Sequence, residues 1–524
     1  GDLDRTFIRT QLRSGDFTSD NFDPFFEKFY NFNRDYGVQW NFTRNLTLTG
    51  NAQAQAIVDE PFGDLNAPGS RQVVQENLLK LGRMKDYSQR FGGNYKLPLD
   101  KLPLTDWLTA DYGYNASYRW TAASLGLEKI LGNTMQNNRE QTLRSRVDFL
   151  KLYNKSKLLK KVNDYQPKPK KKLTKEEREK QKREEAKKKQ EEAKKKKQKQ
   201  EKPEPVVELK DTTQKGKKTK KSKKAKTQKA KDDKAPVNPI VRTIFRTLMS
   251  VRSANFNYTL TEGTTLPGII GNPRYLGLAD NWGAPGFGFV LGNQNPNQRF
   301  DFVNNGWMVL PPDTSLVQNN PFIHNRTENI NLNMIIEPFR DFKITADAKM
   351  TRTDNYQEIF RFDTLARNYA SLSPYRNGTY QVTTISIGTA FNRDNSINSE
   401  TFNKFINNLD RYQQQLTQQN PNAISDTSYR RRSQDVLIAA FMDSYIGNGL
   451  NNGVSAFPKI PLPNWSVDYT GLAKLPGFKE IFQSISITHR YSSEYRIGNY
   501  TSALEYQNTA LLQLSNNFGN YVQP

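Results

Sequence analysis

Residue types that carry covalent and acid-base catalysis are scarce in this sequence of 524 residues. There is no cysteine, which excludes disulfides, thiolate metal sites and thiol nucleophiles within these residues. The two histidines are His324 and His489, and a Ser-His-Asp triad would have to use one of them. His489 lies in SISITHRYS, where Ile485, Ile487 and Tyr491 share its side of a predicted strand, so we interpret it as a structural residue.

Two glycine-containing segments resemble phosphate-binding loops only in part. GAPGFGFVLG, at residues 283–292, lacks the full glycine fingerprint of a dinucleotide site. GKKT, at residues 216–219, has Lys218 at the position where a P-loop requires Ser or Thr. We therefore expect no enzyme activity, no cofactor and no metal site, and we interpret the scattered Asp and Glu residues as charges that face water.

The net charge of +24 is concentrated in one lysine-rich tract. Residues 168–234 contain 28 Lys, 2 Arg and 13 acidic residues, so they contribute +17 and the rest of the chain contributes +7. The tract has little to bury and is predicted to be a disordered, solvated insert. No aromatic residues interleave with its lysines, so we expect no specific nucleic-acid binding. A tethered arm for anionic headgroups or an acidic partner, and a plain solvated loop, both stay open.

The rest of the sequence consists of long segments in which apolar and polar residues alternate, as in β-strands. Several reach the ~9–11 residues of a tilted membrane-spanning strand, against ~5–6 for an average strand. No apolar run approaches the ~18–20 residues of a transmembrane helix. The alternating segments are residues 36–42, 46–56, 108–120, 252–260, 342–350 and 465–469.

The alternation gives each predicted strand a polar face and an apolar face. A basic residue at mid-depth on a lipid-facing surface would destabilise the membrane-inserted strand by about 2–4 kcal/mol. In a membrane-spanning strand the charged residues should therefore all lie on the face that points away from lipid. A soluble barrel or sandwich also alternates and stays an alternative. The residues predicted to line a water-filled pore are Asn115, Ser117, Asn255, Asn257, Thr345 and Asp347; those predicted to face lipid are Tyr112, Tyr114, Tyr118, Phe256, Tyr258, Ile344, Ala346 and Ala348.

The connections between strands predict an organisation typical of outer-membrane barrels, with short turns at one end and long loops at the other. Turns at 43–45, 98–103 and 337–341 are short, whereas those at 57–85 and 122–137 are long. The opening GDLDRTF and the strand-like end indicate an internal piece of a longer chain. We predict barrel strands and loops at 1–160, a periplasmic low-complexity insert at 161–240, strands at 241–350 with an outer loop at 261–328, a cap or gate at 351–463, and strands at 464–524.

A helix is predicted inside the cap, because Phe402, Phe405, Leu409 and Tyr412 fall on one helical stripe. Its apolar side is expected to pack within its own loop.

Several segments together resemble a known family, over nearly the whole chain except the lysine-rich tract. They include FNRDYGVQWNFTRNLTLTGNA at 32–52, GRMKDYSQRFGGNYKLPLDKLPLTDWLTADYGYNASYRW at 82–120 and NWGAPGFGFVLG at 281–292. They continue with EPFRDFKITADAKMTRTDNYQE at 337–358 and FPKIPLPNWSVDYTGLAKLPGF at 457–478. The chain thus resembles the SprA (Sov) family of outer-membrane translocons of the type IX secretion system.

This resemblance implies an all-β chain that forms a segment of a very large antiparallel transmembrane β-barrel with long outer loops, in the outer membrane of a bacterium of the Bacteroidota. Its lumen would conduct folded cargo with a C-terminal signal and support gliding motility where the host glides. The implied partners are secreted cargo proteins, a PorV-like partner barrel, a periplasmic plug protein and outer-membrane lipid. A nutrient-uptake or porin-type barrel and a soluble structural or adhesive β protein remain the alternatives.

Overall fold

The computed structural model describes residues 1–11, 23–64, 68–164, 239–295, 297–310, 318–363, 367–392, 395, 398–419, 429–447 and 457–501. The lysine-rich tract and the GKKT segment lie outside the described residues, together with the predictions made for them. The chain divides into two compact units. One comprises residues 1–155 and 246–524, and the other residues 156–245, where α4 (Lys157–Asp164) and most of α6 (Pro239–Leu248) are found.

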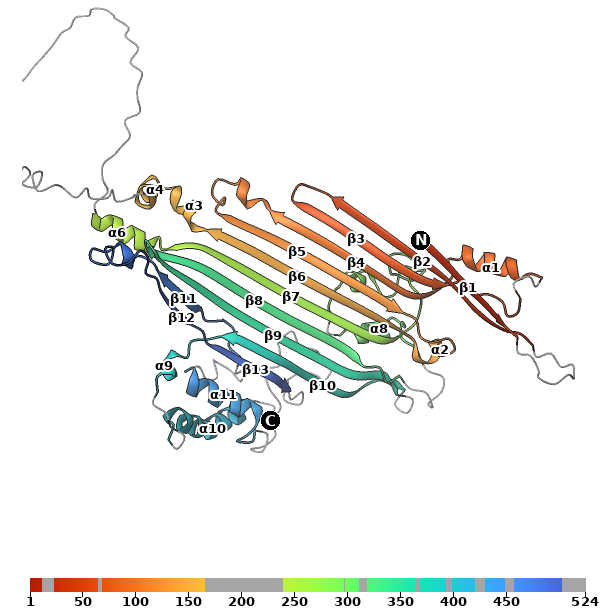
Figure 1. Ribbon diagram of the computed structural model, residues 1–524. Helices are drawn as coiled ribbons and strands as arrows, with labels where there is room; N and C mark the ends of the chain where they lie inside the picture. Colours follow the sequence, from red (N-terminus) through yellow and green to blue (C-terminus); the bar gives the residue numbers. More distant parts are fainter. Residues whose placement is uncertain are drawn as a thin grey trace, which may run out of the picture. The chain divides into compact units, whose positions relative to one another are not determined.

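The first unit is built on a sheet of thirteen antiparallel strands (Figure 1). Strands β1 to β10 pair in chain order, β13 follows β10, and β11 and β12 continue from β9. The pairing confirms the all-β antiparallel prediction. Among the described residues β1 and β13 do not pair, so a closed barrel stays a prediction. The strands are β1 (Asp2–Thr10), β2 (Phe25–Asn41), β3 (Leu46–Ile57), β4 (Arg83–Leu97), β5 (Leu108–Thr121), β6 (Asn133–Asp148), β7 (Val251–Ile269), β8 (Phe322–Phe339), β9 (Phe342–Asp363), β10 (Asn368–Thr383), β11 (Asn464–Tyr469), β12 (Ile487–Tyr491) and β13 (Glu494–Thr501).

Three hairpin turns lie at one end of the sheet, which we call the inner end; the opposite end is the outer end, where β9 and β10 are also joined by a short connection. The β2–β3, β4–β5 and β8–β9 hairpins turn here, as predicted. At the first of them the Thr43 side-chain oxygen accepts hydrogen bonds from the backbone amides of Asn45 (3.2 Å) and Leu46 (3.0 Å). This contact replaces the ladder hydrogen bonds that the turn residues cannot make.

Strands β7, β8 and β9 run farther toward the outer end than the sequence predicted. The predicted outer loop 261–328 shrinks to 270–321, because β7 continues to Ile269 and β8 begins at Phe322. The predicted cap 351–463 likewise loses its first part to the outer half of β9 and to β10. Charged residues enter the alternation here: Glu262, Arg326 and Arg352 lie close to the predicted strand ends.

Residues 384–463 form a helical excursion with α9 (Ile387–Ala390), α10 (Glu400–Gln419) and α11 (Gln434–Tyr445). The predicted helix is confirmed as α10. Its Leu409, Tyr412 and Leu416 are buried against Val436 and Ala439 of α11, so the helix packs within its own excursion as expected.

The excursion separates two short strands, β10 and β11, that lie end to end along the same edge of β9. The outer part of β9 pairs with β10 and its inner part pairs with β11, so two short strands lie end to end beside it. Strands β13 and β12 occupy the next position in the same way. At the break, the Ser386 and Ser493 hydroxyls are 2.7 Å apart, and the Ser493 amide donates to the Asn464 side chain at 3.0 Å.

Candidate functional site

The strand register assigns every side chain of the sheet to one of two faces, because directly opposite residues in antiparallel strands share a face. The amide face is the one that carries Asn115, Asn257 and Asn331; the aromatic face carries Tyr114, Tyr258 and Leu332. The six residues predicted to line a pore all lie on the amide face. The eight predicted to face lipid all lie on the aromatic face.

The centre of the amide face is polar without being charged. On β7 and β8 its described side chains are amides and hydroxyls, with a single glycine among them. On β9, Thr351 donates a hydrogen bond to the Asn329 side chain at 2.9 Å, and the Thr353 and Thr379 hydroxyls are 2.8 Å apart. These residues are Asn255, Asn257, Thr259, Thr261, Gly263 and Thr265 on β7, and Asn325, Thr327, Asn329, Asn331 and Asn333 on β8.

Two hollows lie on the amide face at its β2–β8 side. The larger has a volume of about 1000 Å³ and includes Ser117, Asp35, Arg90 and Arg119 in its lining. The smaller, about 280 Å³ and nearer the inner end, includes Asn115. The described residues contain no group of three or more His, Cys, Asp or Glu that would hold a metal ion. The arrangement offers a hydrated contact surface in which the uncharged strip on β7 and β8 is flanked by charged side chains, such as Glu140 and Arg144 on β6 and Lys349 on β9.

The aromatic face carries an exposed apolar band toward the inner end. On β2 its members Tyr36, Val38 and Trp40 are 56%, 68% and 57% exposed. On β7 the band lies between two charged residues, Arg252 and Glu262. We define the band by the aromatic-face residues within 36–42 on β2, 254–260 on β7, 330–336 on β8 and 344–346 on β9. Ala348 and Met350 of β9 are only 2% and 6% exposed, so the prediction that Ala348 faces lipid is wrong.

A charge ladder, which the sequence analysis did not identify, crosses the aromatic face on the outer side of the band. Arg326 Nη1 lies 3.5 Å from Glu262 Oε1, and Arg376 Nε donates to Asp354 Oδ1 at 2.8 Å. Arg139 forms an ion pair with Glu262, and Arg326 is directly opposite Asp354. Signs alternate over five strands, so each buried carboxylate has cationic neighbours that offset the loss of water.

The outer boundary of the band runs obliquely across the strands. Its first charged residue is Arg34 on β2, Arg139 on β6 and Arg352 on β9. Directly opposite residues can be followed from Arg352 on β9 across seven strand spacings to Trp40 on β2. Trp40 is six residues from Arg34, the boundary residue on β2. With ~3.4 Å per residue and ~4.8 Å per spacing, the boundary is inclined by about 30° to the perpendicular across the strands.

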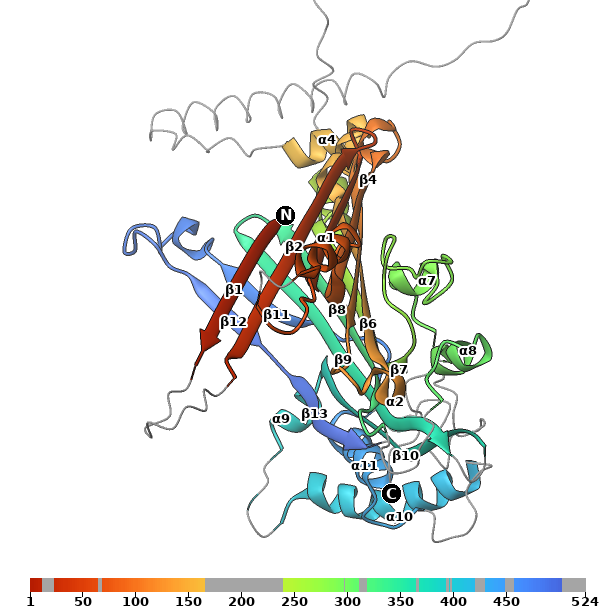
Figure 2. The same cartoon turned by 90° about the vertical axis from the view of Figure 1, so that its right-hand side faces the viewer.

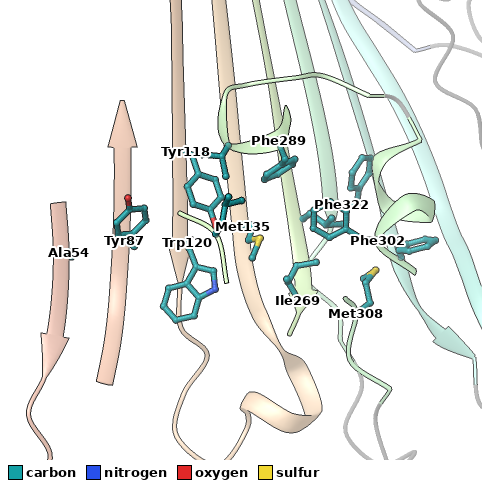
Figure 3. Packing of buried hydrophobic residues seen from close by; sticks show 14 of the residues in the cluster. Ala54, Tyr87, Tyr118, Trp120, Met135, Ile269, Phe289, Phe302, Met308 and Phe322 are labelled. Atoms are coloured by element: carbon teal, nitrogen blue, oxygen red, sulfur yellow. The ribbon is translucent and has the colours of Figure 1, made fainter. Parts of the chain in front are cut away.

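Beyond this boundary the loop 270–321 covers the aromatic face (Figure 3). Its helices α7 (Phe287–Val290) and α8 (Gln298–Asn304) lie on one side of the sheet in Figure 2. Trp120 and Tyr118 of β5 are 0% and 1% exposed, and Tyr118 packs edge-on against Phe289 at 6.1 Å. The prediction that Tyr118 faces lipid is therefore wrong: β5 extends past the apolar band, and its outer residues contact protein.

A buried ion pair fixes α8 to the sheet. Arg299 of α8 and Glu358 of β9 form a salt bridge with both side chains fully buried. The Arg299 guanidinium also lies 4.4 Å from the Phe300 ring centroid and 4.9 Å from that of Phe322. Burial lowers the pKa of Arg299, and the Glu358 carboxylate opposes that shift.

The helical excursion also packs against the aromatic face. Met442 of α11 and the nearby Phe457 contact a cluster that includes Met350, Val382 and Tyr495. Both long connections thus make their core contacts on the aromatic side, which differs from the predicted cap over a pore.

Helices of the described ranges are all too short or too polar to cross a membrane. Comparison of the sequence with protein-family models and with curated proteins gave no match.

Proposed function

We propose that this chain forms part of the wall of a protein-conducting barrel in the bacterial outer membrane. It would act as a translocon of the type IX secretion system, which passes folded cargo with a C-terminal signal to the cell surface and supports gliding motility where present. The observation that carries the proposal is the division of one sheet into a hydrophilic face, uncharged along β7 and β8, and a face with an oblique apolar band.

The height of the band supports a membrane position. Arg252 and Glu262, which limit it on β7, are ten residues apart, or ~34 Å along the strand. A strand tilt of about 40° reduces this to about 26 Å, close to the ~25 Å apolar band of outer-membrane barrels. The inclination of the boundary, about 30°, approaches the ~35–45° tilt of such strands. Packing in a soluble sandwich would not require the boundary to run at that angle.

The amide face supports conduction of large cargo. On β7 and β8 the amides and hydroxyls keep their hydration and form no ion pairs, so this strip would not retain folded proteins of varied surface charge. Among the described residues the sheet is also open after eleven strand positions, so a complete barrel would need further strands and a wider lumen. Secreted cargo would contact the amide face, and outer-membrane lipid would contact the band. The PorV-like partner barrel and the periplasmic plug protein are proposed from the resemblance alone.

A porin-type or nutrient-uptake barrel is the second candidate. It draws support from the larger hollow, where Asp35, Arg90 and Arg119 place charges of both signs beside polar side chains. Such a barrel would respond to small solutes and would not hold protein cargo.

The deciding experiment is site-specific cross-linking to stalled cargo. The described sequence has no cysteine, so single cysteines are introduced into the full-length protein at Asn257 or Asn331 on the amide face, with Phe256 and Leu332 as matched controls. Cargo is stalled by fusion to a slowly exported folded domain. We expect cross-links at the two amide-face positions and none at the controls. Equal cross-linking on both faces, or none at any position while export proceeds, would reject the translocon.

A further inference from the structure

Cations and aromatic rings alternate on the aromatic face at the outer end of β1 and β2. On β1 the series is Arg5, Phe7, Arg9, and on β2 each of these has a direct partner of the other kind. Arg5 is opposite Tyr30, Phe7 is opposite Lys28, and Arg9 is opposite Phe26. We call these six residues the checkerboard patch.

The cations of the patch lie over the rings. Arg5 is 5.3 Å from the Tyr30 ring centroid, Arg9 is 6.0 Å from that of Phe26, and Lys28 is 5.8 Å from both Phe7 and Phe26. Four cation–ring contacts thus fall within these two strands.

The patch holds three cations against two carboxylates, and its two arginines reach solvent. Glu60 accepts a hydrogen bond from Arg5 Nε at 2.6 Å and lies 4.0 Å from the Lys28 ammonium, while Asp64 lies 3.9 Å from Arg9. The Lys28 side chain is 12% exposed and its ammonium donates to the Pro61 carbonyl oxygen at 2.7 Å. The Arg5 and Arg9 side chains are 38% and 49% exposed, and Arg5, Lys28 and Ser70 help to line a hollow of about 350 Å³.

The patch also continues directly from the apolar band. Arg34 is the boundary residue of the band on β2, and Lys28 lies six residues farther toward the outer end. At the strand tilt of an outer-membrane barrel this places Lys28 about 15 Å above the band. If the band spans the hydrocarbon, that height is the headgroup region of the outer leaflet.

We propose that the checkerboard patch binds the phosphorylated saccharide headgroup of an outer-leaflet glycolipid. Arg and Lys bind phosphate oxygens through charge-assisted hydrogen bonds, and the ring faces offer apolar surface to sugar rings. This inference rests on the outward orientation of the aromatic face in the proposed function, and not on the identity of the cargo.

The test measures glycolipid binding to the full-length protein in detergent by native mass spectrometry, with doubly phosphorylated lipid A and its dephosphorylated form as probes. The variant carries Arg5→Gln, Arg9→Gln and Lys28→Gln. The control is Arg274→Gln, because Arg274 is also an exposed cation beside an aromatic ring (Tyr275, 5.9 Å) and a carboxylate (Asp280, 3.1 Å). Since each cation near an anionic headgroup contributes about fivefold in affinity, we expect the triple variant to lose about 100-fold and the control to be unchanged.

A charge-conserving variant separates binding from folding. Arg5→Lys with Arg9→Lys should retain binding within about tenfold, because the cations remain while the planar fork is lost. Unchanged binding in the triple Gln variant, or equal affinity for the dephosphorylated lipid, would overturn the proposal. Complete displacement by millimolar inorganic phosphate would also overturn it, by indicating a site for a free anion. Cargo export is assayed in parallel: glycolipid binding without any cargo export would reject the translocon and leave the patch standing.

Discussion

Glu262 is the residue on which the charge ladder depends most, because it contacts two arginines from neighbouring strands. Its side chain is 7% exposed, and Arg139 and Arg326 are about one-fifth exposed. Glu262→Gln would leave both guanidinium groups beside a neutral amide in a site largely shielded from water. We expect it to lower the free energy of unfolding by about 3 kcal/mol, measured by denaturant titration of the extracted protein.

The control for this prediction is Asp111→Asn, which removes a carboxylate from the exposed amide face of β5. It should change the free energy of unfolding by no more than about 0.5 kcal/mol. Equal effects of the two substitutions would show that the ladder is not a stabilising network.

Ala346 and Thr345 are adjacent residues of β9 on opposite faces, so they test the membrane assignment directly. Ala346→Lys would place an ammonium in the apolar band and cost about 2–4 kcal/mol, which should impair assembly of the protein into the outer membrane. Thr345→Lys places the same group on the hydrated face and should be tolerated. Comparable amounts of folded, membrane-inserted protein for both variants would contradict the band.

At the scale of elements, β9 is the strand whose whole course is informative, since its inner part crosses the band and its outer part lies under protein. Single cysteines at each position from 342 to 350, probed with a membrane-impermeant maleimide in native outer membranes, should react at Lys343, Thr345, Asp347 and Lys349. Positions of the other parity should be protected. Labelling at every position would mean that this part of β9 does not cross a bilayer.

The break between β10 and β11 makes a second element-scale prediction. Because the Ser386 and Ser493 oxygens are 2.7 Å apart, a cysteine at each position should form a disulfide on mild oxidation. The excursion is packed against the wall through Met442 and Phe457, so we expect export to continue after cross-linking. Loss of export on oxidation, restored by reduction, would show that the excursion must move away from the wall.

Local sequence predicted the faces of the strands but not their full lengths. The alternation at 108–120, 252–260 and 342–350 assigned every predicted site residue to the face on which it lies, because a period of two requires only neighbouring residues. Strand ends at Ile269, Phe322 and Asp363 were missed, since a charged residue within a strand reads locally as a loop residue. The Glu262 carboxylate is stabilised in the middle of β7 by Arg139 and Arg326. This pairing depends on the register between strands that are distant in the sequence.

For the whole molecule, the interrupted strand position determines an order of events during synthesis. The inner part of β9 has no neighbour on that side until β11 arrives, and β11 follows residues 384–463 in the chain. Because translation runs from the N-terminus, the helical excursion has left the ribosome before β11 can pair. The backbone groups at this edge of β9 therefore have no strand partner until residues 384–463 have been made and β11 reaches them.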